Sequence, residues 1–244
     1  MIWIDISLLV LIGLVAGFVK GTSSFGSSLV AVPLLFRLGF TASEVVTIMI
    51  TCNIALNLML INEHKKYYTW ENTRTILPII ISGVIFTGVG LFLNELLADR
   101  VIEIIAFVLI ISAILVKAGL LKIKLKDTFL NLFIVGMLSG TGNGIASVDG
   151  PPVVLYLTGV NADKERFKST LSIHFFVMGI VGVIILAIFG NYNPDVLLST
   201  LTLFCGLVIG LYTGIYFSRR INEQQFSKIV LIILVGLAAT LLIP

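Results

Sequence analysis

Residues 13–35 read GLVAGFVKGTSSFGSSLVAVPLL, which is two apolar runs joined by a polar segment rich in glycine and hydroxyl residues. A helix needs about 20 apolar residues to cross the roughly 30 Å of hydrocarbon in a bilayer. The run after the polar segment covers only 26–38, which is too short to span. The pattern therefore predicts a long helix and a short helix that meet at a polar break inside a membrane.

The composition of the whole chain supports this interpretation. Of its 244 residues, 58% are hydrophobic and 12% are charged, whereas about a quarter of a soluble domain is charged. The opening residues lack the basic start and cleavage site of a secretory signal, so we expect them to form the first helix. Both cysteines lie in apolar runs, without a disulfide framework or metal pattern. We expect one all-α integral membrane domain with no cofactor and no nucleic-acid partner.

Ten apolar segments are predicted from the positions of charge, glycine, proline and asparagine. They cover 3–19, 26–38, 44–61, 75–97, 101–116, 129–141, 151–157, 169–189, 196–217 and 226–243. Two of them, 26–38 and 151–157, are too short to cross a bilayer. We expect about eight to ten membrane segments, depending on whether the first, second, sixth and seventh cross fully or re-enter.

The segments form an internal repeat. Gly17, Gly21 and Pro33 correspond to Gly136, Gly140 and Pro152, each pair being 119 residues apart. The motif at Gly90 matches that at Gly214, 124 residues later. Both halves keep the order long, short, long, long, long. The predicted organisation is a first membrane repeat at 1–120 and a second at 121–244.

Lysine and arginine in short loops predict the orientation, because basic residues favour the cytoplasmic side. The loops with Lys65 and Lys66, with the lysines of 117–126, and with Arg219 and Arg220 are expected inside. The loop 190–195 has no basic residue and is expected outside. It is the repeat-mate of the Lys65 loop, so the halves should be inverted, as in many secondary transporters.

Two polar segments, 20–28 and 139–152, are predicted to be unwound and to enter the membrane from opposite sides. Non-helical backbone at membrane depth is tolerated only where it is buried in protein or lines a polar cavity. Helix N-termini with nearby hydroxyls bind oxyanions without requiring a fixed positive charge. A second interpretation is that the glycines only allow close helix packing. The hydroxyl, amide and ionisable residues among them favour a substrate site.

The candidate substrate-binding residues come from both polar segments and from three helical positions outside them. They are Lys20, Gly21, Thr22, Ser23, Ser24, Gly26, Asn53, Asn57, Gly140, Thr141, Gly142, Asn143, Gly144, Asp149, Gly150, Pro151 and His174.

Several of these residues admit more than one role. Lys20 either faces the site or extends to the cytoplasmic surface. Asp149 caps the following helix, carries a proton or pairs with Lys20. His174 either packs through a hydrogen bond or carries a proton. Asn53 and Asn57 share one helix face and either line the pathway or bond between helices. The charged run 163–168 is expected to be solvated.

Residues 13–35 and the later stretches GMLSG (136–140) and DGPPVVLYLTGVNADKERFKSTLSIHF (149–175) resemble the motifs of one transporter family. The sequence looks like the TauE/SafE sulfite exporter family, also called the TSUP permeases. This resemblance implies a permease for small sulfur-containing or organic anions such as sulfite, sulfonates or sulfoacetate. It also implies the cytoplasmic membrane of a prokaryote.

The expected function is secondary transport of a small oxyanion. Neither a hydrolase nor a metalloprotease motif is present, so an enzyme is not expected, and no Walker A sequence is found. The coupling ion (a proton or sodium), the direction of transport and the oligomeric state stay open. Two alternatives are a passive anion channel and a non-transporting assembly factor or membrane sensor.

Overall fold

The computed structural model describes residues 2–63, 65, 76–120, 124–218 and 220, and the described part is helical without a strand. The helices are α1 (Ile2–Ser23), α2 (Ser27–Arg37), α3 (Ala42–Glu63), α5 (Leu77–Leu96), α6 (Asp99–Lys117), α7 (Phe129–Ala146), α8 (Gly150–Gly159), α9 (Lys164–Phe189) and α10 (Pro194–Ser218).

Within the described part, α1, α3, α5, α7, α9 and α10 are long and apolar enough to cross a membrane. The all-α integral membrane class is confirmed. The predicted tenth segment, 226–243, and the basic loop residues Lys66, Lys122 and Arg219 lie outside the described residues.

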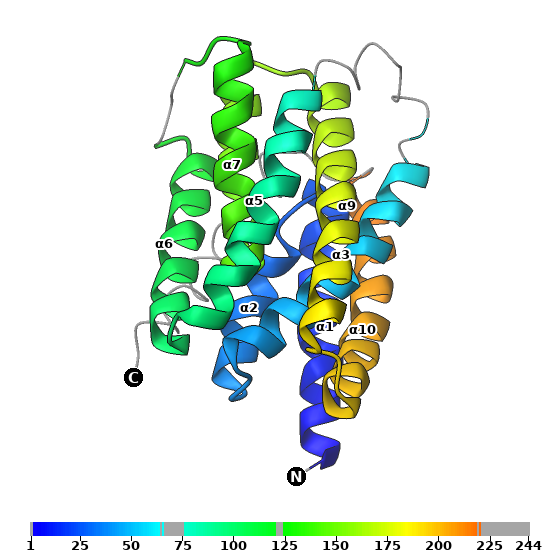
Figure 1. The fold of residues 1–244 in the computed structure, drawn as a ribbon. Coiled ribbons are helices and arrows are strands. Elements are labelled where there is room, and N and C mark those ends of the chain that lie inside the picture. The colour runs from blue at the N-terminus through cyan, green and yellow to red at the C-terminus, as the bar shows by residue number, and fades with distance from the viewer. Residues whose placement is uncertain (1, 64, 66–75, 121–123, 219, 221–244) are drawn as a thin grey trace.

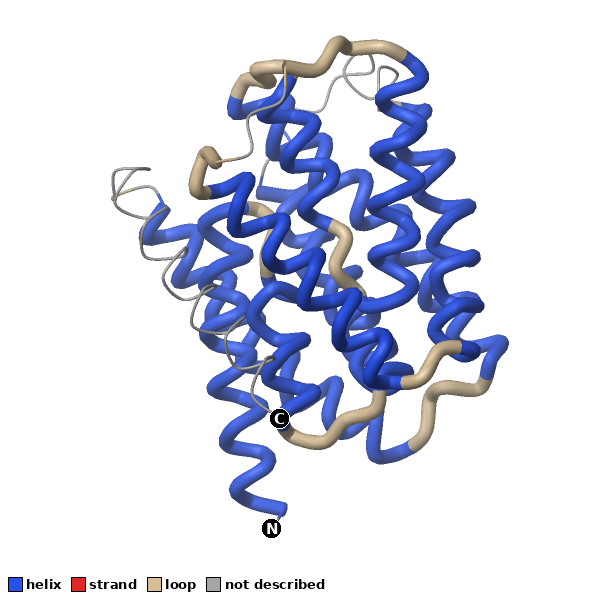
Figure 2. The backbone as a smooth tube through the Cα atoms, turned by 90° about the vertical axis from the view of Figure 1, so that its left-hand side faces the viewer, coloured by secondary structure: helices blue, strands red, loops and turns tan. Residues whose placement is uncertain are grey.

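Two short helices follow two of the spanning helices, as the sequence predicts. α2 has 11 residues and α8 has 10. Only residues 24–26 separate α1 from α2, and only 147–149 separate α7 from α8. We call these segments the first break and the second break. In Figure 2 the loop segments that interrupt the helices lie midway along the bundle, while the other loops gather at its two ends.

The breaks are shorter than predicted. α1 remains helical through Ser23 and α7 through Ala146, so the prediction of unwound backbone over 20–28 and 139–152 is wrong. The Thr22 hydroxyl bonds to the carbonyl of Val19 at 2.7 Å, and the Thr141 hydroxyl to that of Met137 at 2.9 Å. Hydroxyl residues that bond back to the preceding turn are compatible with a helix, so they do not mark unwound backbone here.

Glycines bring two pairs of parallel helices into close contact. α1 packs along α10, and α7 packs along α5. A Cβ added at Gly13, Gly17 or Gly21 would collide with backbone of α10, and one added at Gly136, Gly140 or Gly144 would collide with backbone of α5. Such small-residue faces let membrane helices approach closely. The packing interpretation therefore holds for Gly21, Gly140 and Gly144.

These contacts give the register of the two halves. Gly83 of α5 and Leu207 of α10 are 124 residues apart, the same separation as Gly90 and Gly214. Gly17 lies against the Leu207 carbonyl and Gly140 lies against the Gly83 carbonyl, so Gly17 is the counterpart of Gly140. Residues of α1 and α7 therefore correspond at a separation of 123, not 119. The glycines of both helices recur every fourth residue, so a shift of one turn leaves most of them matched. The predicted pairing of Gly17 with Gly136 is one helical turn out of register.

The corresponding helices run in opposite directions. Figure 1 shows α1 rising from the N-terminal end of the bundle while α7 descends from the opposite end. In the same view α3 rises and α9 descends, and α5 descends while α10 rises. The predicted boundary between repeats at residue 120 and the predicted cytoplasmic face stay predictions.

Two glycines of α5 give a matched test of the helix packing. A Cβ at Gly90 would lie 2.6 Å from the Thr141 carbonyl oxygen, whereas one at Gly88 would meet only the end of Ile185 at 3.4 Å. We expect Gly90→Ala to destabilise the protein by about 1–3 kcal/mol through overpacking. Gly88→Ala should be neutral or stabilising by up to about 1 kcal/mol, because alanine favours helix. Unfolding in detergent measures both; equal effects would contradict the packing account.

Candidate functional site

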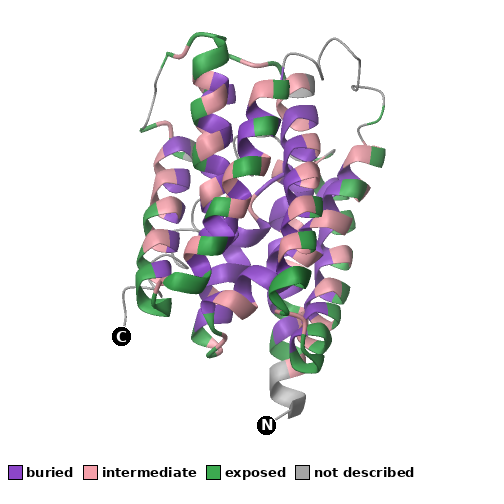
Figure 3. Ribbon diagram, in the orientation of Figure 1, coloured by how far each residue is buried: buried purple, intermediate pink, exposed green. Residues whose placement is uncertain are grey.

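The two breaks meet in the interior of the bundle. A Cβ added at Gly150, the first residue of α8, would lie 3.1 Å from Cδ2 of Phe25 in the first break. Phe25 itself is buried. Figure 3 shows that buried residues concentrate in α2 and in the helices around it. Polar groups carried by the breaks therefore lie within one protein-enclosed region.

A serine in the left-handed conformation directly follows α1, and another directly follows α7. The φ angles are 64° at Ser24 and 54° at Ser147. The N–H of Ser24 donates to the Lys20 carbonyl at 2.7 Å, and that of Ser147 to the Asn143 carbonyl at 2.8 Å. Both hydroxyls are buried without a hydrogen-bond partner.

These two serines are costly to the fold. A left-handed conformation costs a residue other than glycine about 1–2 kcal/mol. An unsatisfied buried hydroxyl costs about 1–3 kcal/mol more. The same two costs occur at corresponding positions of both breaks, which leaves two hydroxyls available to hydrogen-bond a bound anion.

Lys20 is held inside the protein by an asparagine of α3. Only 2% of Lys20 is exposed, and its ammonium donates to Oδ1 of Asn53 at 2.9 Å. The same oxygen accepts the Ser27 hydroxyl at 2.9 Å, and Nδ2 of Asn53 donates to the Ser28 hydroxyl at 3.2 Å. The alternative in which Lys20 extends to the surface is excluded. An ammonium has three donors, so Lys20 retains donors for a ligand.

The N-terminus of α2 is the better anion-binding end of the two short helices. α2 begins after Gly26, whose φ is 93°, and its first turn has no acidic residue. The N–H groups of that turn are free of intrahelical partners and carry the positive end of the helix dipole. α8 instead has Pro151 and Pro152 in its first turn, and proline has no N–H.

Neither Ser23 nor Ser24 caps α2, although both lie just before it. No side chain caps this helix. The Ser23 hydroxyl bonds instead to the carbonyls of Val19 and Phe25, at 2.7 and 2.6 Å. The N-terminal amides of α2 therefore remain open to a ligand.

Asp149 occupies the N-cap position of α8, but its side chain makes no capping hydrogen bond. The Asp149 carboxylate and the Lys20 ammonium attract each other electrostatically. Of the roles considered for Asp149, pairing with Lys20 is thus supported and side-chain capping is not. The residue is half-buried.

His174 is fully buried and belongs to a hydrogen-bond chain that ends at the second break. The Ser139 hydroxyl donates to the Asp149 carbonyl at 2.8 Å and lies 3.0 Å from Nε2 of His174. Because the one proton of the Ser139 hydroxyl is used in the bond to Asp149, Ser139 accepts from Nε2–H of His174. The other ring nitrogen, Nδ1, is buried without a partner. The chain supports a hydrogen-bonded packing role for His174.

The other candidate residues lie in helices next to the breaks. The carbonyl of Val148 lies where a Cβ of Gly142 would project. Asn143 donates to the Thr87 hydroxyl at 3.4 Å. Asn57 is fully buried in α3, and neither its amide nitrogen nor its amide oxygen has a partner. Binding roles for these residues, and for Gly21, Thr22, Gly140, Thr141 and Gly144, stay predictions.

Sequence reasoning missed Ser147, Ser139, Ser27 and Ser28 as site residues. The signal for Ser147 is its position 123 residues after Ser24, which becomes visible only in the correct repeat register. Ser27 and Ser28 fall within the predicted polar segment 20–28 but are not among the predicted binding residues.

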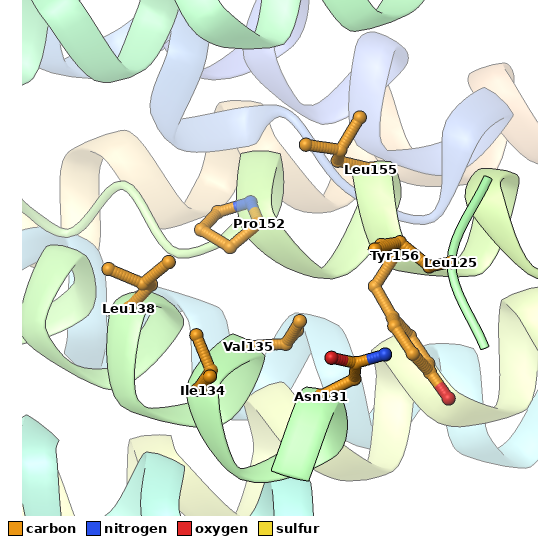
Figure 4. Close-up of a pocket in the computed structure, with 8 residues that line it drawn as sticks. All are labelled: Leu125, Asn131, Ile134, Val135, Leu138, Pro152, Leu155 and Tyr156. Atoms are coloured by element: carbon orange, nitrogen blue, oxygen red, sulfur yellow. The ribbon is translucent and has the colours of Figure 1, made fainter. Parts of the chain in front are cut away.

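A cavity of about 190 Å³ lies between α7 and α8, away from the polar site. Figure 4 shows its lining, which consists of Leu125, Asn131, Ile134, Val135, Leu138, Pro152, Leu155 and Tyr156. The Asn131 amide donates to the Lys126 carbonyl, and the Tyr156 hydroxyl donates to Asp127. With mostly aliphatic walls and its polar groups already engaged, this cavity does not suit an anion.

An ion pair anchors the end of α8 that lies away from the second break. Arg166 donates to Asp127 at 2.6 Å, and the Asp163 side chain accepts the Arg166 N–H at the start of α9. Partial burial raises the pKa of Asp127, but hydrogen bonds from Tyr156 and Arg166 outweigh it and lower that pKa. The expectation that the run 163–168 is merely solvated is therefore wrong for Asp163 and Arg166.

Comparison with known proteins gives one family. A family model described as "Sulfite exporter TauE/SafE" matches residues 9–241. Neither a curated protein nor a solved structure matches the chain.

The Lys20–Asn53 contact can be tested by a double-mutant cycle. Asn53→Leu removes the acceptor of a buried ammonium and should cost about 2–3 kcal/mol of unfolding free energy. Adding Lys20→Met removes the stranded charge and should recover at least about 1 kcal/mol. The control is Asn62→Leu, at an exposed position of the same helix. Strictly additive effects of Lys20→Met and Asn53→Leu, measured by unfolding in detergent, would show that the two side chains are not coupled.

Proposed function

Because the chain belongs to the sulfite exporter TauE/SafE family of membrane transporters, we propose that it is a permease for a small oxyanion such as sulfite or a sulfonate. We place it in the cytoplasmic membrane of a prokaryote, as the family resemblance implies. The observation that carries the proposal is the pair of buried, unpartnered serine hydroxyls at the two breaks. One of them, Ser24, lies one helical turn after the buried Lys20.

In this proposal the anion binds where the first break meets α2. The Lys20 ammonium supplies the charge, and the first-turn N–H groups of Ser27 and Ser28 supply donors aligned with the helix dipole. The Ser24 hydroxyl donates from the same break, and the Ser147 hydroxyl from the opposite one. A ligand held by both breaks contacts both halves of the protein, as substrates of inverted-repeat transporters do.

The helix pairs α1–α10 and α5–α7 are the rigid bodies that we propose to move. Each pair is held by backbone-to-backbone contact along a glycine face, and each carries one of the breaks at its end. Since one helix of each pair comes from each predicted repeat, movement of one pair against the other would open the site to one side at a time. This proposal includes the predicted division into repeats at 1–120 and 121–244.

A passive channel is the second candidate. The packing of Phe25 against Gly150 favours a transporter, because the ring occupies space between the two breaks. Flux of labelled sulfite and of methanesulfonate in proteoliposomes separates the candidates. Saturable uptake supports the permease, and conductance that does not saturate supports the channel. Absence of flux for both anions would reject transport and favour the non-transporting alternatives.

Replacing each left-handed serine by glycine separates binding from stability. Ser24→Gly and Ser147→Gly relieve backbone strain of about 1–2 kcal/mol, so folding should be unchanged or more stable. Each loses a hydrogen bond to a charged ligand, worth about 1.5–3 kcal/mol, so anion affinity should fall by roughly 10- to 100-fold. Proteoliposome uptake and thermal unfolding measure the two effects.

Asn161→Gly is the matched control, because Asn161 also has a positive φ, of 51°, but lies after α8 and outside the site. It should relieve strain and leave transport unaltered. Wild-type affinity in both serine variants would show that their hydroxyls do not contact the anion.

A further inference from the structure

We propose that Asp149 binds the proton that couples this transporter to a proton gradient. In its ionised form Asp149 neutralises Lys20 while the site is empty, and in its protonated form it yields Lys20 to the anion. The inference rests on the anion site proposed above and names the coupling ion and the residue that carries it.

The charge distribution of the protein supports this assignment. Among the described residues, Lys20 is the buried charged residue, and Asp149 lies at the break that faces it. The other charged side chains of the described part lie in loops or near helix ends at the two ends of the bundle. A charge in the membrane interior is expensive unless it is paired. Lys20 and Asp149 therefore form the charge balance of the empty site.

Binding of a monoanion disturbs this balance. With Asp149 ionised, the site would hold two negative charges and one positive charge. Like charges that share a site cannot both stay ionised cheaply. If the Asp149 carboxylate takes up one proton and becomes a neutral carboxylic acid, Lys20 is left to pair with the anion. One anion and one proton then enter together, and the net charge of the site does not change.

The position of Asp149 leaves its carboxyl free to change protonation. Its side chain makes no N-cap hydrogen bond to α8. The backbone N–H groups that interact with its carboxylate are its own and that of the adjacent Gly150. Its backbone carbonyl is held separately, by Ser139. The corresponding position in the first half, 123 residues earlier, is Gly26, so the carboxyl occurs in the second break and has no counterpart in the first.

Lys20, Cys52 and His174 are buried titratable groups on helices around Asp149, and each has a different role. Lys20 of α1 is its partner charge. The Cys52 thiol of α3 donates to the Thr200 carbonyl at 3.6 Å. His174 of α9 donates from Nε2 to the Ser139 hydroxyl, and no residue of α7 is titratable. Asp149 is thus the acidic group of this cluster that meets both the anion site and Lys20.

The test uses methanesulfonate, a sulfonate that stays ionised at all the pH values used, so that only the protein titrates. One-proton coupling predicts that methanesulfonate affinity falls about tenfold per pH unit once Asp149 ionises. Asp149→Asn mimics the protonated carboxyl, so its affinity should not change with pH. In proteoliposomes the variant should still exchange internal for external methanesulfonate, but a pH gradient should no longer drive accumulation.

Asp195→Asn is the matched control, because Asp195 is an exposed aspartate in the first turn of α10. It should keep the wild-type pH slope. A wild-type slope in Asp149→Asn, or a slope lost in His174→Gln but kept in Asp149→Asn, would overturn the proposal.

A measurement on the unmodified protein serves if Asp149→Asn does not fold. Adding methanesulfonate to purified protein in weak buffer above neutral pH should raise the pH through uptake of one proton per anion bound. Binding without proton uptake would overturn the coupling proposal alone. Absence of binding and flux for every anion in the wild-type protein would instead overturn the proposed transport function.

Discussion

The burial of one lysine ammonium in a lipid-embedded bundle is the constraint around which the site is organised. Lys20 lies at the last turn of α1 with 2% of its surface exposed. Such a charge requires partners, because the surroundings cannot solvate it. Asn53 supplies an oxygen from α3, Asp149 supplies a negative charge from the opposite half, and the remaining donors are free for an anion. The empty site is therefore neutral but incompletely hydrogen-bonded, which suits a ligand that must bind and leave.

The glycine faces explain why the two breaks can meet. α1 and α7 remain helical up to the breaks, because close contact with α10 and α5 stabilises their last turns. The chain then reverses over three residues in each half, with a left-handed serine at the same register position. Short reversals between packed helices place polar groups more reproducibly than long unwound loops. The site depends on this precision, because its ligands come from both halves.

Much of the architecture can be predicted from the sequence, and the predictions that are wrong have identifiable physical reasons. Apolar run lengths and the proline and glycine pattern predict the long and short helices correctly. The length of the breaks is not predictable in this way, because residues such as Thr22 and Thr141 are equally compatible with a helix that satisfies their hydroxyls internally. The repeat register was missed because glycines spaced by four residues match at more than one offset. Lys20 and Asp149 were recognised as candidates, but whether they attract each other depends on how the two halves fold together.

The most direct test of the account is a structure of the protein with 2-bromoethanesulfonate, whose bromine locates the anion by anomalous scattering. We expect the sulfonate within hydrogen-bond distance of Lys20, Ser24 and Ser147, with Phe25 displaced from Gly150. A sulfonate bound at full occupancy elsewhere, while Phe25 stays packed on Gly150 and both serine hydroxyls stay unpartnered, would contradict it.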